Sequence, residues 1–329
     1  MTPAACTVVL LNWNGWRDTL ACVASVARSS PAAARIIVCD NGSSDDSWAR
    51  LSEAFGRDWG SRLRLIQAGP DPAQETLADS DALVLLGTGR NLGFAGGMNA
   101  GLRLALQDPA CTHVWLLNND TEVAPDALAQ ALQLMQARPG VGLCGATLVY
   151  LHDRQTVQAW GGSAYSRATG RTRHLGYGQS LASRPDDARP VEASMACVVG
   201  AAMLVSRRFI ETVGLMHEDY FLYFEEMDWA ARARGRFQLA WAPACVVFHH
   251  EGASIGTAAK GGSPLSLYYL FRNRLRFAWR YHRAWVPLVF LSASLDVGRL
   301  LAGRRWAQAA AAARGLLQWP MRWPASERG

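Results

Sequence analysis

Acidic side chains stand directly after apolar runs at several points of the sequence, and Asp40 is the first of them. Asp40 ends the run IIVCD, and the Asn41-Gly42 pair that follows predicts a tight turn. An ionised carboxylate only accepts hydrogen bonds, so Asp40 could hold the N3–H of a uracil or thymine ring, or a ribose hydroxyl. The alternative for this cluster is a plain turn with a helix cap at Ser44 or Asp45.

A second carboxylate, Asp120, ends the run LLNND. A carboxylate at a strand end suits a hard divalent cation shared with a diphosphate, because phosphate oxygens and water can complete the coordination shell. His249 follows another apolar run, and a nitrogen ligand would tilt the choice from Mg²⁺ toward Mn²⁺. The alternatives are a strand-ending turn for Asp120 and a structural role for His249.

Three acids lie within four positions of the aromatic stretch 223–229, YFEEMDW. On a helix, Glu225 and Asp228 share a face, whereas Glu226 points about 100° away from Glu225. Aromatic surroundings remove water from a carboxylate and raise its pKa toward that of a useful general base. The alternative is ordinary helix stabilisation, which fits Asp228 best because Arg232 follows four residues later.

The glycine-rich stretch 87–99, GTGRNLGFAGGMN, precedes a predicted helix. Such a stretch permits close approach of the backbone to a nucleotide, although a flexible loop has the same composition. Its G-x-G-x-x-x-G spacing and its depth in the chain do not fit the dinucleotide-binding fingerprint. A nicotinamide-dependent oxidoreductase is therefore disfavoured.

The elements around these clusters alternate between strand and helix patterns, which predicts an α/β fold with a largely parallel sheet. In such sheets ligands bind beyond the carboxyl ends of the strands, where the polar clusters fall. Residues 152–194 are rich in Gly, Ser, Arg and Thr, and indicate a long loop or small excursion, either a functional lid or a dispensable insertion. Strands are expected at 7–11, 36–39, 63–67, 83–86, 113–117 and 244–248, with apolar order also at 196–205, and helices at 17–28, 46–55, 99–106, 125–137 and 219–235.

The composition is that of a folded chain with about two domains, since 50% of the 329 residues are hydrophobic and 18% are charged. The net charge of +6 is spread along the chain without a nucleic-acid-binding module, so no nucleic-acid partner is expected. The seven cysteines show no CxxC pair, which favours buried thiols and a reducing compartment. No secretion signal is indicated.

The chain after the glycine-rich hinge 256–262 is expected to be helical to its end. Residues 268–329 combine many arginines with tryptophans, a pattern typical of helices lying at a bilayer interface. Packing on the rest of the protein or dimerisation is the alternative. No transmembrane helix is expected, because the most apolar candidate, 285–302, contains Asp296 and Arg299. The tryptophans are Trp279, Trp285, Trp306, Trp319 and Trp323.

Taken together and in order, the motifs resemble the inverting nucleotide-sugar glycosyltransferases of the GT-A fold, family 2, with a likeness to the bacterial rhamnosyltransferase-like branch. The resemblance covers roughly residues 6–256. The segment 268–277, YYLFRNRLRF, also looks like that branch's helical continuation. The motifs are VVLLNWNG (8–15), CDNGSSDDS (39–47), GRNLGFAGGMNAG (89–101), LLNNDTEV (116–123), VVGAAMLV (198–205), GLMHEDYFLYFEEMDW (214–229) and FHHEGAS (248–254).

This resemblance implies a GT-A catalytic domain over residues 1–256 and a helical extension over 257–329. It implies that Glu226 is the catalytic base, at a position that is more often Asp in the family, with Glu225 and Asp228 as a supporting acidic cluster. Asp120 and His249 would bind a divalent metal, Mn²⁺ or Mg²⁺, on the donor diphosphate, with support from Asn118. The implied nucleotide- and donor-binding residues are Asn12, Asn14, Asp40, Asn91, Gly93, Asn99, Asn118 and Asn119.

The implied activity is inverting transfer of a sugar from a nucleotide-diphosphate donor to a hydroxyl of a glycan or lipid-linked glycan, in the synthesis of cell-surface polysaccharide. The likeness favours dTDP-rhamnose, with UDP- and GDP-sugars left open. It also implies a cytoplasmic protein, peripheral on the inner face of the cytoplasmic membrane. A non-catalytic protein that binds a nucleotide sugar or glycan on the same fold is the alternative. The sequence does not indicate an oligomeric state.

Overall fold

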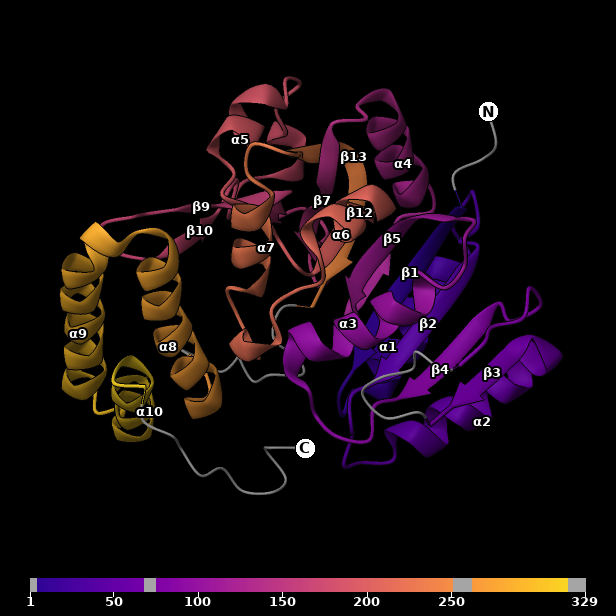
Figure 1. Ribbon diagram of the computed structural model, residues 1–329, viewed down its shortest axis with the longest axis horizontal. Helices are drawn as coiled ribbons and strands as arrows, with labels where there is room; N and C mark the ends of the chain where they lie inside the picture. The colour runs from indigo at the N-terminus through magenta and orange to yellow at the C-terminus, as the bar shows by residue number, and fades with distance from the viewer. Residues whose placement is uncertain (1–4, 68–74, 251–261, 319–329) are drawn as a thin grey trace.

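The computed structural model describes residues 5–67, 75–250 and 262–318, and a large mixed sheet lies between helices in it (Figure 1). The strand order is β3-β4-β2-β1-β5-β12-β7-β13-β6, and β8 also pairs with β7. The pairs among β1 to β5 are parallel, whereas β12 runs antiparallel to both β5 and β7. The strands of this sheet are β1 (Ala5–Asn12), β2 (Arg35–Asp40), β3 (Leu63–Ile66), β4 (Leu83–Gly87), β5 (Cys111–Asn118), β6 (Thr121–Val123), β7 (Val141–Tyr150), β8 (Val157–Trp160), β12 (Ala202–Ser206) and β13 (Gln238–His249).

The helices cover both faces of the sheet, because the inner strands alternate side chains between two apolar cores. Val8 and Leu10 face the core beneath α1, α2 and α4, whereas Val9 faces the core beneath α3, α6 and α7. All seven cysteines are free and buried. The helices are α1 (Trp16–Ala27), α2 (Ser47–Trp59), α3 (Gly93–Ala105), α4 (Ala127–Ala137), α5 (Arg189–Ser194), α6 (Arg207–Val213), α7 (Glu225–Ala233), α8 (Pro264–Tyr281), α9 (Val286–Ala302) and α10 (Trp306–Leu316).

The register of the parallel strands brings their carboxyl ends together. Asn12 of β1 pairs with Asp40 of β2, and Leu11 pairs with Asn118 of β5. Asp40 pairs in turn with Gly87, at the end of β4. Polar residues that are far apart in the sequence therefore meet at one edge of the sheet, as the sequence predicted.

Residues 152–194 form the small excursion rather than an irregular loop. β8 joins the main sheet, and β9 (Gly162–Tyr165), β10 (Thr172–His174) and β11 (Cys197–Val198) make a second, three-stranded sheet. Sequence periodicity did not reveal these strands because their core is supplied by distant residues. Trp160 stacks on Trp241 of β13, with ring centroids 5.7 Å apart.

Two further elements differ from the sequence expectations. β7 was not anticipated at all, and the helix expected from residue 219 begins only at Glu225. The later start has a local cause, because Phe221, Tyr223 and Phe224 have φ angles of 63°, 66° and 72°, which are not helical.

The C-terminal helices α8, α9 and α10 stand together at one end of the molecule (Figure 1). Of these, α8 contributes Phe277 to the core beneath α7. By length and composition alone, Arg283–Ala302 could cross a membrane, since its mean hydropathy is 1.4. Only 11% of its most apolar stretch is buried inside the protein. The sequence expectation of no span rested on Asp296 and Arg299, and these two form an ion pair at 2.6 Å. Trp319 and Trp323 lie outside the described residues.

Candidate active site

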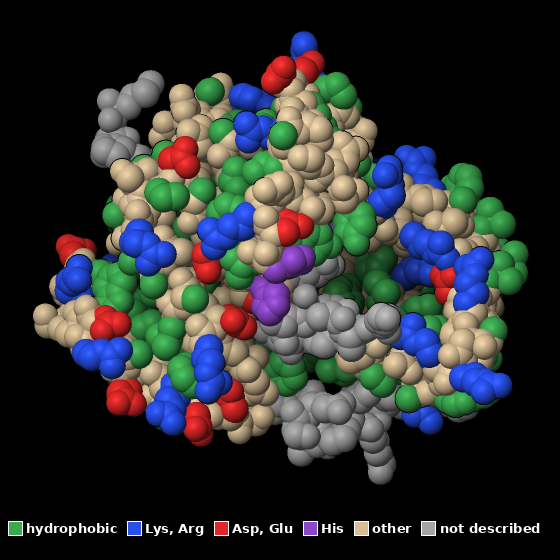
Figure 2. All heavy atoms as spheres, turned by 180° about the vertical axis from the view of Figure 1, so that it is seen from behind, with side chains coloured by type: hydrophobic (Ala, Val, Ile, Leu, Met, Phe, Trp, Pro, Cys, Tyr) green, Lys and Arg blue, Asp and Glu red, His purple; other side chains and the backbone are tan. Residues whose placement is uncertain are grey.

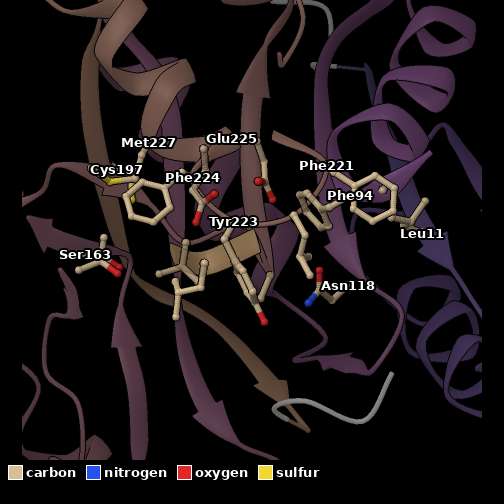
Figure 3. Close-up of a pocket in the computed structure, with 18 of the residues that line it drawn as sticks. Leu11, Phe94, Asn118, Ser163, Cys197, Phe221, Tyr223, Phe224, Glu225 and Met227 are labelled. Carbon is tan, nitrogen blue, oxygen red and sulfur yellow. The ribbon is translucent and has the colours of Figure 1, made fainter. Parts of the chain in front are cut away.

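A cavity of about 440 Å³ opens beyond the carboxyl ends of β1 and β5. Figure 3 shows Asn118 and Glu225 around this cavity together with the aromatic residues of the segment before α7. Asp120 and Glu226, which are 106 positions apart in the chain, both line it. The sequence-predicted site residues in its wall are Asn91, Gly93, Asn118, Asn119, Asp120, Glu225, Glu226 and His249.

Asp120 and His249 form one side of the cavity. The carboxylate Oδ1 of Asp120 lies 3.2 Å from Nε2 of His249, and both residues are buried. The amide nitrogen of Asn118 lies 3.5 Å from the same ring nitrogen. The backbone N–H of His250 donates to the carbonyl of Asp120 at 2.9 Å, which ties the end of β13 to this turn.

Gln158 of β8 determines that Nδ1 of the His249 ring carries a hydrogen. Its amide nitrogen donates to the backbone carbonyl of His249 at 2.9 Å, so its amide oxygen must be the atom that faces Nδ1, at 2.7 Å. An amide oxygen only accepts, and therefore Nδ1 carries a proton; in the neutral form of the ring, Nε2 then presents a lone pair toward Asp120. A lone pair facing a carboxylate is favourable when a cation lies between them, so this donor set fits a divalent metal.

Few side chains near Asp120 and His249 are of a kind that binds a metal. Within the described ranges, no group of three or more His, Cys, Asp or Glu side chains is arranged to hold a metal. Asp120 and His249 would thus supply part of a coordination shell, and diphosphate oxygens and water would have to supply the rest.

Glu225 and Glu226 are neighbouring carboxyl groups on another wall of the cavity. Burial raises the pKa of Glu226 to about 7. Burial and the charge of Glu226 raise the pKa of Glu225 well above its ordinary value. Glu225 is 4% exposed, and its Oε2 has no hydrogen-bond partner among the described residues. Near neutral pH, Glu226 is therefore the member of the pair that can exchange a proton.

The segment 221–224 holds this carboxyl pair in place. Three of its aromatic residues have left-handed backbone conformations, which cost free energy unless surrounding contacts maintain them. Asn273 of α8 supplies such contacts. Its buried side-chain amide donates to the carbonyls of Tyr220, Leu222 and Tyr223 at 2.8, 2.7 and 3.0 Å.

The remaining predicted residues do not line the cavity. Asp40 is buried behind it, where the amide of Asn12 and the hydroxyl of Ser43 donate to its Oδ1 at 2.7 and 2.6 Å. Burial raises the pKa of Asp40, and these hydrogen bonds partly oppose that rise. Asn14 accepts from the backbone N–H of Ser44 at 2.8 Å, so it shapes the turn after β2.

Asn99 and Asp228 also lie away from the cavity wall. Asn99 exchanges two hydrogen bonds with the backbone of Met216, at 2.9 and 3.2 Å. Asp228 is fully buried and accepts from Arg232 at 2.8 Å and from the hydroxyl of Tyr281 at 2.7 Å. The structure thus gives Asp228 the helix pairing with Arg232 that was the alternative interpretation of the sequence.

Sequence reasoning missed Gln158, Asn273, Asn41 and Trp13. Asn41 accepts from the backbone N–H of Leu92 at 3.0 Å and so ties the turn at 91–93 to the end of β2. Trp13 lines the cavity, and its buried indole N–H finds no acceptor in the described part of the chain. Trp13 and Asn41 stood inside recognised motifs, whereas Gln158 lay in a segment without periodicity.

The chain matches a known family over most of its length. Residues 3–276 match the family described as "Glycosyltransferase like family 2". A protein of Sinorhizobium fredii named uncharacterized protein y4gI is 30% identical over 151 residues. The low-salt glycan biosynthesis hexosyltransferase Agl10 of Haloferax volcanii is 23% identical over 158 residues. These matches cover 44% and 47% of this chain, but only 16% and 47% of the two relatives.

Two solved structures share the architecture. GalNAc-T7 with UDP, GalNAc and Mn²⁺ has a TM-score of 0.58 at 13% identity, covering 82% of this chain and 47% of that one. The mannosyltransferase PcManGT from Pyrobaculum calidifontis, in complex with GDP-Man and Mn²⁺, has a TM-score of 0.55 at 14% identity, covering 97% and 88%. The fold is thus the GT-A fold that the sequence resemblance implied.

Proposed function

Because the chain belongs to the glycosyltransferase-like family 2, we propose that it is an inverting, metal-dependent glycosyltransferase. It moves a sugar from a nucleoside-diphosphate donor to a hydroxyl of a glycan or lipid-linked glycan, in cell-surface polysaccharide synthesis. The observation that carries this proposal is the shared cavity of Asp120 and Glu226. A metal-facing carboxylate and a carboxyl poised to take a proton are the two groups that such a displacement needs.

The donor occupies the part of the cavity beyond β1 and β5. Asn91, Gly93, Asn118 and Asn119 line that part, and the side chain of Trp13 also contributes to the cavity wall. Asp40 and Asn12 support the base-binding end from behind the wall. We keep dTDP-rhamnose as the favoured donor, on the likeness to the rhamnosyltransferase-like branch. The two structural neighbours carry UDP and GDP-Man, so UDP- and GDP-sugars remain in the set to be tested.

The chemistry follows from the positions of the side chains. Glu226 accepts a proton from the acceptor hydroxyl, whose oxygen attacks the anomeric carbon on the face opposite the diphosphate. The bond to the diphosphate breaks as the new glycosidic bond forms, and a single displacement inverts the anomeric centre. Asp120 and His249 would hold the divalent cation, which when bound neutralises charge on the departing nucleoside diphosphate.

A ligand screen tests the proposal on the whole protein. A ligand that binds only the folded state raises the melting temperature, so dTDP-, UDP- and GDP-sugars are compared with and without Mn²⁺ or Mg²⁺. We expect one nucleotide to raise the melting temperature in a metal-dependent manner, and its sugar to be transferred or slowly hydrolysed. Metal-dependent binding without turnover would favour the non-catalytic alternative.

In this proposal residues 1–256 bind the donor, and the acceptor approaches beside the extension 257–329. The proposed location is the inner face of the cytoplasmic membrane. It is supported by the apolar side chains that α9 exposes, which include Leu288, Leu291 and Leu295. These three positions follow helical spacing and form one stripe.

A further inference from the structure

A second cavity, also of about 440 Å³, lies between α8, α9, the residue before α10 and the turn before β10. Thr172, Phe224 and Leu270 line both this cavity and the candidate active site. Phe224 stands only two residues before Glu226. The second cavity therefore adjoins the carboxyl pair from the side of the C-terminal helices, and nothing in the proposed donor site uses it.

The second cavity carries a strong excess of positive charge. Four arginines and one acid line it, which leaves three positive charges in excess. Asp296 orders three of these arginines, accepting from Arg274 at 2.9 Å, from Arg299 at 2.6 Å and also from Arg171. The fourth is Arg305. Guanidinium groups held in this way form planar forks that match phosphate oxygens.

The same cavity also has apolar lining residues. Leu267 and Phe271 of α8 and Leu300 of α9 are among them. Figure 2 shows basic side chains gathered over the C-terminal helices, beside hydrophobic ones at the rim of the molecule. Outside the cavity, α9 exposes further apolar side chains, including Leu291 and Leu295, each 56% exposed. The site thus suits a ligand with an anionic group and an apolar chain.

We propose that this cavity binds the phosphate or diphosphate group of a lipid-linked acceptor. The lipid chain lies along α9 in the membrane interface, and the sugar end of the acceptor reaches Glu226 past Phe224 and Leu270. The proposal rests on the proposed function, since it assigns the acceptor class of that site. The donor diphosphate has its own place beside Asp120 and His249, so a second anion site next to the base fits the other substrate.

Calorimetric titration of the full chain tests this assignment, with farnesyl diphosphate and inorganic pyrophosphate as probes. We expect farnesyl diphosphate to bind more tightly than pyrophosphate. The double variant Arg299→Gln/Arg305→Gln should bind farnesyl diphosphate at least about tenfold more weakly, because a hydrogen bond to a charged group contributes roughly that factor. Arg314→Gln, an exposed position on α10 outside the cavity, is the matched control and should bind like the wild type.

A second titration, with the donor nucleotide, distinguishes failure of the acceptor site from failure of the proposed function. Each variant is also titrated with the metal and nucleoside diphosphate that bind best to the wild type, and this affinity should be unchanged. Equal binding of farnesyl diphosphate by the double variant and the wild type would overturn the assignment. Equal affinity for pyrophosphate and farnesyl diphosphate would overturn the lipid part. Absence of any metal-dependent nucleotide binding by the wild type would instead count against the proposed function. If the double variant does not fold, Arg171→Gln is tested in its place.

Discussion

At the scale of single residues, the two neighbouring glutamates have different expected roles. Glu226→Gln should lower the rate of sugar transfer by about 10²–10⁴-fold, since an amide cannot accept the proton. Affinity for the donor should stay close to that of the wild type. Glu225→Gln is the matched control, with an expected loss of less than about tenfold, because burial and the charge of Glu226 raise the pKa of Glu225 and favour its neutral form, which an amide resembles. Near wild-type transfer by Glu226→Gln would show that the base lies elsewhere.

The same glutamate predicts how activity depends on pH. Burial raises the pKa of Glu226 to about 7, and the base must be ionised to act. kcat/KM should therefore fall as the pH drops below about 7, with an apparent pKa that belongs to the carboxyl pair. A pH–rate profile of the wild type with a soluble acceptor checks this. A flat profile between about pH 5 and 8 would contradict it.

The pH dependence of stability should be opposite to that of activity: stability should fall as the pH rises. The folded-state pKa of Glu226 lies above its ordinary value of 4.5, so between these values the folded state binds more protons than the unfolded state. The free energy of unfolding should fall as the pH rises through that window. Glu226→Gln removes this loss. The free energy of unfolding is measured by denaturation at about pH 5 and 8. Relative to the wild type, that of Glu226→Gln should be higher at about pH 8 than at about pH 5.

Gln158 is expected to act on the metal through His249. Gln158→Glu keeps an acceptor opposite Nδ1, whereas Gln158→Leu removes it and frees the ring to change tautomer. Gln158→Leu should weaken Mn²⁺ binding by about 10- to 100-fold, as other outer partners of metal ligands do. Mn²⁺ paramagnetic resonance with the donor nucleotide present measures the affinity directly. The glutamate variant should retain most of it.

At the scale of elements, α8 is expected to influence the candidate active site, because its residue Asn273 donates hydrogen bonds to the segment 220–223. Asn273→Ala would remove the side-chain donor of three carbonyls, of which that of Tyr220 keeps the backbone N–H of Leu222, and should lower the free energy of unfolding by about 2 kcal/mol. It should also lower kcat more than it raises KM for the donor, since the aromatic segment positions Glu226. Trp279→Ala, on the exposed face of the same helix, is the control for both measurements.

At the scale of the whole molecule, the outward face of α9 predicts membrane attachment. In flotation with anionic liposomes, the wild type should rise with the liposomes. The triple variant Leu288→Gln/Leu291→Gln/Leu295→Gln should stay at the bottom of the gradient. Substitution is preferable to truncation at residue 265, because truncation would also remove Asn273. Equal behaviour of the two proteins in flotation would contradict a role of this face in binding membranes.

The sequence by itself determined the alternation of strands and helices and the position of Asp40, Asp120 and His249 at strand ends. These follow from local signals, since continuous apolar runs make inner strands and their carboxyl ends meet at one edge. The order of the motifs also indicated the family, which the match over residues 3–276 establishes.

Only the tertiary structure decided which of these residues share a cavity. It separated Asp228 from Glu226, placed Asp40 behind the wall, and brought Gln158 and Asn273 to the site, although neither residue was predicted to belong to it. The physical reason is that burial, tautomer and backbone strain are set by contacts between distant residues, such as the three carbonyls that Asn273 holds. No local pattern encodes such contacts, because both partners must first be folded into place.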